Sequence, residues 1–256
     1  MSGAYIATNE IGDSSNISVS SENSSYPKEN LYDLKAAKVF RCTSKTTLSI
    51  TIDFGESVQA DTIAIINHNF SSGATIVLKN GDDSPYSTIA SIAYREHDIW
   101  KAFTAESAQV WVVSITDSNS DYLQIGQLLI GTKIALPNAR RIGQNYSPAR
   151  QREVVSGETY GGVITKYHLY DRLVLNPTFL ISSSSDLAIF TGLDSETYGD
   201  VYPFVYIPDT ADDDCFYVRK EKDFAPIEID RIAGGEILHE YSMTLIESSR
   251  GLEILS

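Results

Sequence analysis

Strict alternation of apolar and polar side chains over residues 48–54 constrains the fold of this chain more than any other feature. Apolar residues stand at the even positions of this segment and polar residues at the odd ones. A period of two is typical of a β-strand with one buried face, and Gly55 supplies a turn after it. The run Ile63–Ile66 is continuously apolar and ends at the polar trio Asn67–Asn69, as expected of a strand buried on both faces. These patterns predict a β-sheet protein.

Similar patterns occur along the rest of the chain. Apolar alternation or short apolar runs predict further strands at residues 74–79, 109–116, 122–131, 163–175, 201–207, 215–219, 227–229 and 237–245. A single short helix is predicted where Ser185 and Asp186 precede Leu187, Phe190 and Leu193, because Ser and Asp cap helix N-termini. The predicted fold class is all-β with one short helix.

Two domains fit within the 256 residues. Residues 12–25 are rich in Ser and Asn, which predicts a loop or an arm that lies on a neighbouring chain. Pro137, Gly143 and Pro148 interrupt regular structure in a segment whose charges are all arginines. We therefore predict an N-terminal arm over residues 1–25, a β-sandwich over 26–136, a basic linker over 137–152 and a second β-rich domain over 153–256.

The formal charge of −14 opposes binding to nucleic acid or to an anionic membrane surface. The N-terminus has no signal-peptide pattern and no apolar run is long enough for a membrane span, so no membrane insertion is expected. Cys42 and Cys215 form no disulfide framework, which agrees with synthesis in a reducing cytoplasm.

No catalytic or cofactor motif is present. The sequence contains no phosphate-binding Gly-rich loop, no G-x-S-x-G elbow and no H-E-x-x-H helix, and its four histidines lie far apart. We expect a protein that is not an enzyme and takes no cofactor.

Two features predict glycan or partner contacts. Asn67, His68 and Asn69 could hydrogen-bond a sugar or a partner backbone, although a loop that satisfies its own backbone is the alternative. Trp100 follows polar residues and is predicted at the surface, whereas Trp111 lies between two valines and is predicted in the core.

Two charged segments each allow a binding interpretation and a purely solvent-exposed one. Arg140, Arg141, Arg150 and Arg152 are predicted to bind carboxylates of a neighbouring subunit, with a solvated loop as the alternative. A weak calcium site is conceivable at the dense carboxylates Asp209, Asp212, Asp213 and Asp214. This segment lacks the Gly and the distal Glu of an EF-hand, so a solvated acidic turn is favoured and no metal is expected.

The order of four motifs resembles a known family. Asn30–Lys35, Ala37–Cys42, Leu48–Gly55 and Ala60–Asn69 follow one another as in the N-terminal module of tailed-bacteriophage tail-tip and baseplate proteins, and Tyr122–Gly131 is similar to the closing strand of that module. The resemblance covers about residues 26–135. It implies a galactose-binding-like (discoidin-like) jelly-roll β-sandwich and, more loosely, a tail-assembly domain like that of distal tail proteins after it.

The resemblance implies a structural virion protein that joins the tail tube to host-recognition components. Its expected partners are copies of itself in a ring, sixfold rather than threefold, and other tail tube, hub or fibre proteins. The alternative is a carbohydrate-binding protein that recognises a host-surface glycan on the loops of the sandwich. A hydrolase is a third hypothesis, for which no carboxylate pair is singled out.

Overall fold

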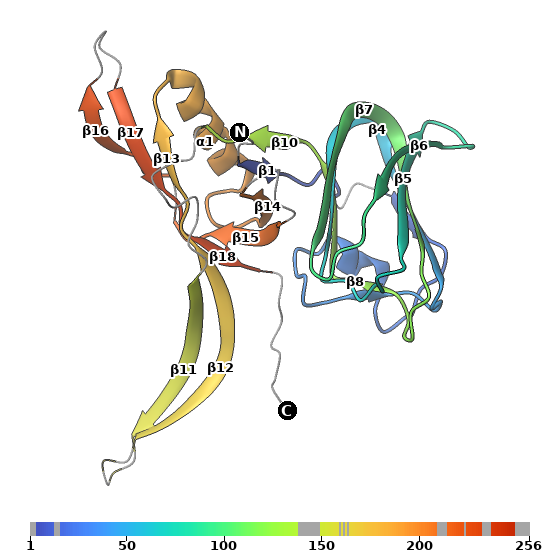
Figure 1. Cartoon of the computed structure of the whole chain (residues 1–256), viewed down its shortest axis with the longest axis horizontal. Coiled ribbons are helices and arrows are strands. Elements are labelled where there is room, and N and C mark those ends of the chain that lie inside the picture. The colour runs from blue at the N-terminus through green and yellow to red at the C-terminus, as the bar shows by residue number, and fades with distance from the viewer. Residues whose placement is uncertain are drawn as a thin grey trace. The chain divides into compact units, whose positions relative to one another are not determined.

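The computed structural model describes residues 4–12, 16–137, 149–158, 160, 162, 164–208, 214–222, 224–231 and 237–248. The chain divides into two compact units: unit 1 holds residues 1–135 and 204–217, and unit 2 holds residues 136–203 and 218–256. Antiparallel strands dominate both units, and the described residues contain one α-helix and one 3₁₀-helix (Figure 1). The all-β fold class with one short helix is therefore confirmed.

Unit 1 contains most of the strands. Its elements are β1 (Tyr5–Ala7), β2 (Asn16–Val19), η1 (Lys28–Leu31), β3 (Phe40–Arg41), β4 (Thr47–Ile66), β5 (Thr75–Gly81), β6 (Ser87–Ile92), β7 (Ile99–Thr116), β8 (Gln124–Ile125), β9 (Gln127–Gly131), β10 (Lys133–Ala135) and β14 (Phe204–Ile207).

One long sheet folds over to make the sandwich of unit 1. Its strand order is β2-β4-β7-β5-β6, and β9 pairs with the second half of β4. β4 and β7 stay paired over almost their whole lengths, with register shifts after Asp53 and Ala60 where the sheet bends. Ile52 before the bends and Ile63 after them belong to one apolar core, which shows that the two halves of the sheet face each other.

A second apolar cluster covers the outer face of the second half of β4. Ala64 and Ile66 pack there with Val205 and Ile207 of β14, which pairs with β1. Residues 63–66 are each at most 1% exposed. The strand is therefore buried on both faces, as its continuous apolar run predicted.

Unit 2 contains the α-helix and a long hairpin. Its elements are β11 (Ala149–Glu158), β12 (Ile164–Leu175), β13 (Thr178–Ile181), α1 (Ser184–Glu196), β16 (Ile227–Arg231), β17 (Ile237–Ser242) and β18 (Leu245–Glu247). β15 (Phe216–Lys220) begins in unit 1 and ends in unit 2. β13, β17 and β16 form a three-stranded sheet, while β12 pairs with β11 and with the short β18.

The helix α1 is capped and anchored by aromatic packing. The Ser183 hydroxyl accepts a hydrogen bond from the backbone N–H of Asp186, so the cap lies two residues before the predicted Ser185. Phe190 packs on Phe179 of β13 and on Tyr241 of β17, with ring centroids 5.2 Å apart in both pairs. Of the apolar positions predicted for this helix, Phe190 therefore faces the sheet, Leu193 is buried and Leu187 is half-buried.

Two segments lie elsewhere than the predicted domains placed them. Part of the predicted N-terminal arm is strand β2, which pairs with β4 and buries Ile17 in the sandwich core, so these residues complete their own sheet. Residues 204–217, predicted in the second domain, belong to unit 1. Of the predicted linker, residues 138–148 lie outside the described residues, and residues 149–152 begin β11.

Candidate functional site

The loop that follows β4 is held by internal hydrogen bonds. Asn67 adopts a left-handed backbone conformation, with φ of 54°. Its side-chain amide donates to the Ala36 carbonyl at 2.7 Å, and its backbone N–H donates to Asp98 Oδ1 at 2.8 Å. Gly126 packs so closely that an added Cβ would lie 2.2 Å from the Ala36 carbonyl oxygen, so no side chain fits there. The polar groups of Asn67 thus serve the loop itself.

Asn69 links three loop segments. Its amide nitrogen donates to the Tyr122 carbonyl at 2.8 Å, and its Oδ1 accepts from the Gln124 N–H at 3.0 Å. The backbone carbonyl of Asn69 accepts from the Asn119 side chain at 2.6 Å. Both ends of the amide are therefore engaged within unit 1.

His68 is held neutral between these two asparagines. Its Nδ1 accepts from the Phe70 N–H at 3.1 Å, and its Nε2 lies 2.7 Å from the His97 carbonyl, which can only accept, so Nε2 carries the proton. Burial lowers the pKa of His68 from 6.5 to about 4, outweighing the opposite effect of that carbonyl. The ring stacks on Phe70 with centroids 4.5 Å apart.

Trp100 is buried rather than exposed, so its predicted surface position is wrong. It is 9% exposed and belongs to the second apolar cluster, with Val205 and Tyr217. The covering strand comes from residues 204–217, which are remote in sequence. Trp111 is fully buried as predicted, and its indole N–H donates to the Ala108 carbonyl at 3.1 Å. The predicted glycan-contact residues therefore comprise three members of a loop network and one core residue.

Two tyrosines, Tyr26 and Tyr122, are exposed on unit 1. Tyr26 is 36% exposed, and the Arg41 guanidinium lies 4.6 Å from the centroid of its ring. Tyr122 is 39% exposed, with Lys45 Nζ 5.4 Å from its ring centroid. Arg41 also donates to the Gln124 side chain at 2.9 Å. We call these five residues the tyrosine rim. Sequence patterns did not indicate it, because its members come from loops and two short strands, β3 and β8, that only the fold brings together.

The β11–β12 hairpin of unit 2 exposes apolar side chains along its length. Figure 1 shows it extending well beyond the rest of unit 2. The two strands pair from Ala149↔Val174 to Glu158↔Ile164, with one register shift. Its large exposed apolar residues, with their exposed fractions, are Val154 (41%), Val155 (51%), Tyr160 (111%), Ile164 (62%) and Tyr167 (65%).

Side-chain contacts and the pairing register define the two faces of this hairpin. Asp171 accepts from His168 Nε2 at 2.7 Å and lies 3.6 Å from Arg152 Nε, so these three share one face. The hydrogen bond from His168 holds the pKa of the Asp171 carboxyl below its usual value. We call this the basic face. Because alternate residues of a strand and their paired neighbours share a face, it also carries Arg150, Val154, Ser156, Glu158, Ile164 and Lys166. The other face, called the Tyr167 face, carries Val155, Gly157, Thr165 and Tyr167.

The remaining predicted site residues are only partly described. Arg150 and Arg152 are exposed on β11, whereas Arg140 and Arg141 lie outside the described residues. Asp214 is exposed, and Asp209, Asp212 and Asp213 also lie outside. Within the described ranges, no group of three or more His, Cys, Asp or Glu side chains could hold a metal ion. No helix there is both long and apolar enough to cross a membrane.

Comparison with known proteins yields structural similarity only. No family model matches the chain, and no curated protein sequence matches it. Among solved structures, the family 32 carbohydrate-binding module of C. perfringens NanJ, in complex with galactose, is similar at 13% identity and a TM-score of 0.42, over 51% of this chain and 99% of that one. A chitosan-binding module from Paenibacillus sp. IK-5 is similar at 13% identity and a TM-score of 0.40, over 45% and 92%.

The Ruminococcus gnavus GH29 fucosidase is similar at 14% identity and a TM-score of 0.42, over 50% of this chain and 27% of that enzyme. Carbohydrate-binding modules are thus among the structures that this chain resembles. Likeness at these TM-scores bears on neither the family nor the ligand of this chain.

Proposed function

We propose that this chain is a structural subunit that assembles with copies of itself, as part of a bacteriophage tail tip or baseplate joining the tail tube to host-recognition components. The exposed β11–β12 hairpin is the observation that carries the self-assembly. The phage setting comes from the order of sequence motifs in residues 26–135.

The hairpin is poorly suited to water on its own. An isolated two-stranded hairpin is at best marginally stable, and contiguous exposed apolar side chains usually mark an interaction surface. On the Tyr167 face, Val155 and Tyr167 are directly paired and both more than half exposed. Among the described strands, β11 also lies at the edge of its sheet, and an edge strand presents backbone groups that can pair with another chain. A neighbouring subunit would cover both the side chains and the edge.

The charge of the basic face favours another copy of this chain as the partner. The net charge of −14 makes distant copies repel each other, but it also means that each copy has an acidic surface. The basic face of the hairpin carries three permanent cations against two carboxylates, so it complements the acidic surface of another copy. Contact between two different patches on successive copies closes into a ring when the rotation permits.

The test is the assembly state of the purified chain. Sedimentation velocity over a range of concentrations should show a discrete oligomer, and electron microscopy should show closed rings. Replacing Val155 and Tyr167 together by Ser should weaken assembly by about tenfold or more in dissociation constant, since truncating a tyrosine at the centre of an interface can cost about 2 kcal/mol or more. Ile227→Ser is the matched control, because Ile227 is 69% exposed on β16 of the same unit.

A wild-type chain that stays monomeric at every concentration would rule out this function. The phage setting has its own test: antibodies against the chain should label the distal end of the tail on phage particles that carry it. Purified particles without the chain, or label elsewhere on the virion, would contradict that part alone.

A second candidate is glycan binding by unit 1, favoured by the tyrosine rim. Tyrosine rings stack on the apolar faces of sugars, and Arg41 and Gln124 supply hydrogen-bonding groups beside Tyr26. Screening against a glycan array, followed by calorimetry, would test it. Binding that Tyr26→Ala and Tyr122→Ala both abolish would support glycan recognition, and the absence of any binding would exclude it.

A further inference from the structure

The turn after α1 displays three large apolar side chains. Tyr198 is 71% exposed, Val201 52% and Tyr202 42%. The two tyrosine rings meet edge to face, with centroids 5.2 Å apart. We call these three residues the aromatic knob. Surface apolar residues are common singly, but three in one turn form a patch that marks an interaction site.

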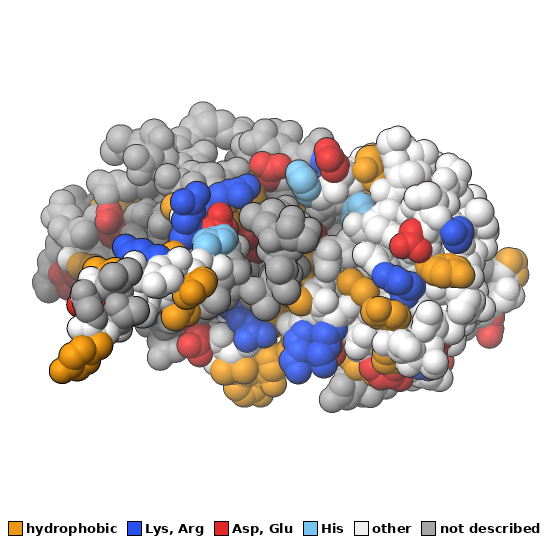
Figure 2. Space-filling model, turned by 90° about the horizontal axis from the view of Figure 1, so that it is seen from below, with side chains coloured by type: hydrophobic (Ala, Val, Ile, Leu, Met, Phe, Trp, Pro, Cys, Tyr) orange, Lys and Arg blue, Asp and Glu red, His pale blue; other side chains and the backbone are white. Residues whose placement is uncertain are grey.

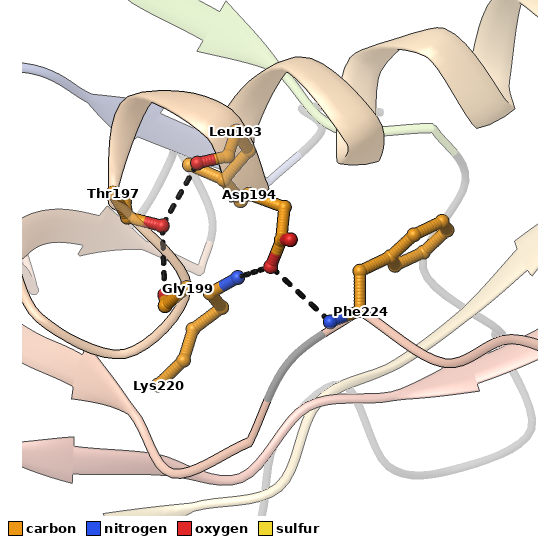
Figure 3. A network of polar contacts seen from close by, with 6 residues as sticks. All are labelled: Leu193, Asp194, Thr197, Gly199, Lys220 and Phe224. Atoms are coloured by element: carbon orange, nitrogen blue, oxygen red, sulfur yellow. Dashed lines mark hydrogen bonds and ion pairs between the residues drawn. The ribbon is translucent and has the colours of Figure 1, made fainter.

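The turn that carries the knob is rigidly held. The backbone N–H of Gly199 donates to the Asp194 carbonyl and that of Tyr202 to the Thr197 carbonyl, both at 2.9 Å. The Thr197 hydroxyl lies 2.8 Å from the Leu193 carbonyl and 2.9 Å from the Gly199 carbonyl (Figure 3). Tyr198 is held at φ of 48°, a left-handed conformation that costs a bulky residue on the order of 1 kcal/mol or more. Such strain persists only where the surroundings enforce it.

A buried ion pair fixes the same turn to the interior of unit 2. Lys220 of β15 is 4% exposed, and its ammonium group is paired with the Asp194 carboxylate. Asp194 also accepts from the Phe224 N–H at 3.2 Å, so the end of α1 is tied to two separate segments (Figure 3). A surface pre-organised in this way loses little entropy when it binds a partner.

The surroundings of the knob are acidic. Residues 184–203 contain no Lys, Arg or His. Asp194 is neutralised by Lys220, but Glu196 and Asp200 are exposed beside the knob. The C-terminal end of a helix adds a partial negative charge, which no basic residue in the last turn of α1 offsets. The knob therefore suits a partner that is apolar and cationic.

The basic face of the hairpin has that character. Val154 and Ile164 are exposed there, beside Arg152 and Lys166. Glu158, which pairs with Ile164, and Asp171 also lie on this face, so its three cations exceed its carboxylates by one. On the face seen in Figure 2, Lys and Arg side chains lie next to apolar ones at the left. Figure 1 also shows the hairpin extending from unit 2 on the side opposite α1.

We propose that the aromatic knob of one copy binds the basic face of the β11–β12 hairpin of the next copy. The contact joins two different patches, so it propagates from copy to copy, as a ring requires. This inference rests on the proposed self-assembly and assigns a partner to the basic face of the hairpin; it assigns none to the Tyr167 face.

Paired charge reversals test this contact. One variant carries Glu196→Lys and Asp200→Lys, and the other Arg152→Glu and Lys166→Glu. Each alone should assemble at least about tenfold more weakly than wild type, because like charges then face each other. An equimolar mixture should recover assembly in alternating rings, since each reversed knob then meets a reversed hairpin. Both variants should keep the circular dichroism spectrum and unfolding midpoint of wild type.

Disulfide trapping provides a test that does not depend on charge. Tyr198→Cys in one chain and Ile164→Cys in another should form an intermolecular disulfide in the mixture, whereas Tyr26→Cys in place of Tyr198→Cys should not. The native Cys42 and Cys215 are buried and do not interfere.

The outcomes separate the two proposals. A monomeric wild-type chain overturns the self-assembly and this contact with it. A wild-type oligomer whose charge-reversed variants assemble equally well, or whose Tyr198→Cys and Ile164→Cys chains do not cross-link, overturns the contact alone.

Discussion

The sandwich of unit 1 and the hairpin of unit 2 use similar alternating strands in opposite ways. In the sandwich, β4 pairs with β7 and β9 and buries its apolar side chains in two clusters. In the hairpin, β11 pairs with only one strand of the described part of the chain, and both faces carry exposed apolar residues. The sandwich thus completes its core within the chain, whereas the hairpin leaves apolar surface for a partner. Folding stability should reside in the first and assembly in the second.

The largest effect should come from the sandwich core. Trp111→Ala should lower the free energy of unfolding by about 3–5 kcal/mol, because Trp111 is fully buried between β4 and β5. Tyr167→Ala should change it by less than about 0.5 kcal/mol, because Tyr167 is 65% exposed. Chemical denaturation monitored by circular dichroism measures both. Equal losses would mean that the hairpin packs within its own chain.

A smaller effect should follow acidification of the loop network. The pKa of His68 is about 4 in the folded chain and 6.5 when unfolded, so protons bind the unfolded chain preferentially between these values. Neutral His68 therefore contributes to the free energy of unfolding above pH 6.5. This contribution, on the order of 2–3 kcal/mol, is lost as the pH falls towards 4.

Acid titration of stability for wild type and His68→Gln isolates this contribution from that of the carboxyl groups. The variant should lose less stability than wild type between pH 7 and pH 4. Parallel pH profiles for wild type and His68→Gln would show that His68 is not held neutral.

The ion pair at the end of α1 should matter to a similar or lesser degree. Asp194→Asn leaves the buried Lys220 without a counter-charge, and we expect a loss of about 2 kcal/mol, reduced because Asp194 is partly exposed. Differential scanning calorimetry measures the shift. Asp200→Asn in the same turn is the control and should be near neutral. If both substitutions are neutral, the pair does not anchor the turn.

Cutting the loop network should have the smallest of these effects. Asn69→Ala removes two hydrogen bonds, which we expect to cost about 1–2 kcal/mol of unfolding free energy, while assembly stays unchanged. Sedimentation velocity and denaturation of the same sample test both parts. Weaker assembly without loss of stability would show that this loop contacts a neighbouring subunit and does not merely support the fold.

Local patterns predicted the fold of this chain better than its surfaces. The run Ile63–Ile66 indicated burial on both faces, which is confirmed, because a covered strand needs no polar face. The surface position predicted for Trp100 was wrong because the strand that covers it comes from residues 204–217. A pattern of neighbouring residues cannot predict a contact between segments so far apart in the sequence. The exposure of Tyr167 was missed for a related reason. Alternation shows which residues share a face, but not whether that face has a partner.

Hydrogen exchange of the hairpin amides tests the central claim most directly. The account predicts that amides of β11, which form the outer edge of the sheet, exchange rapidly in dilute monomer and become protected in the assembled state, while amides of β4 are protected in both. Mass spectrometry of the chain at concentrations below and above assembly gives this comparison. Equal exchange of β11 in the two states would show that the hairpin stays uncovered, and would contradict the account.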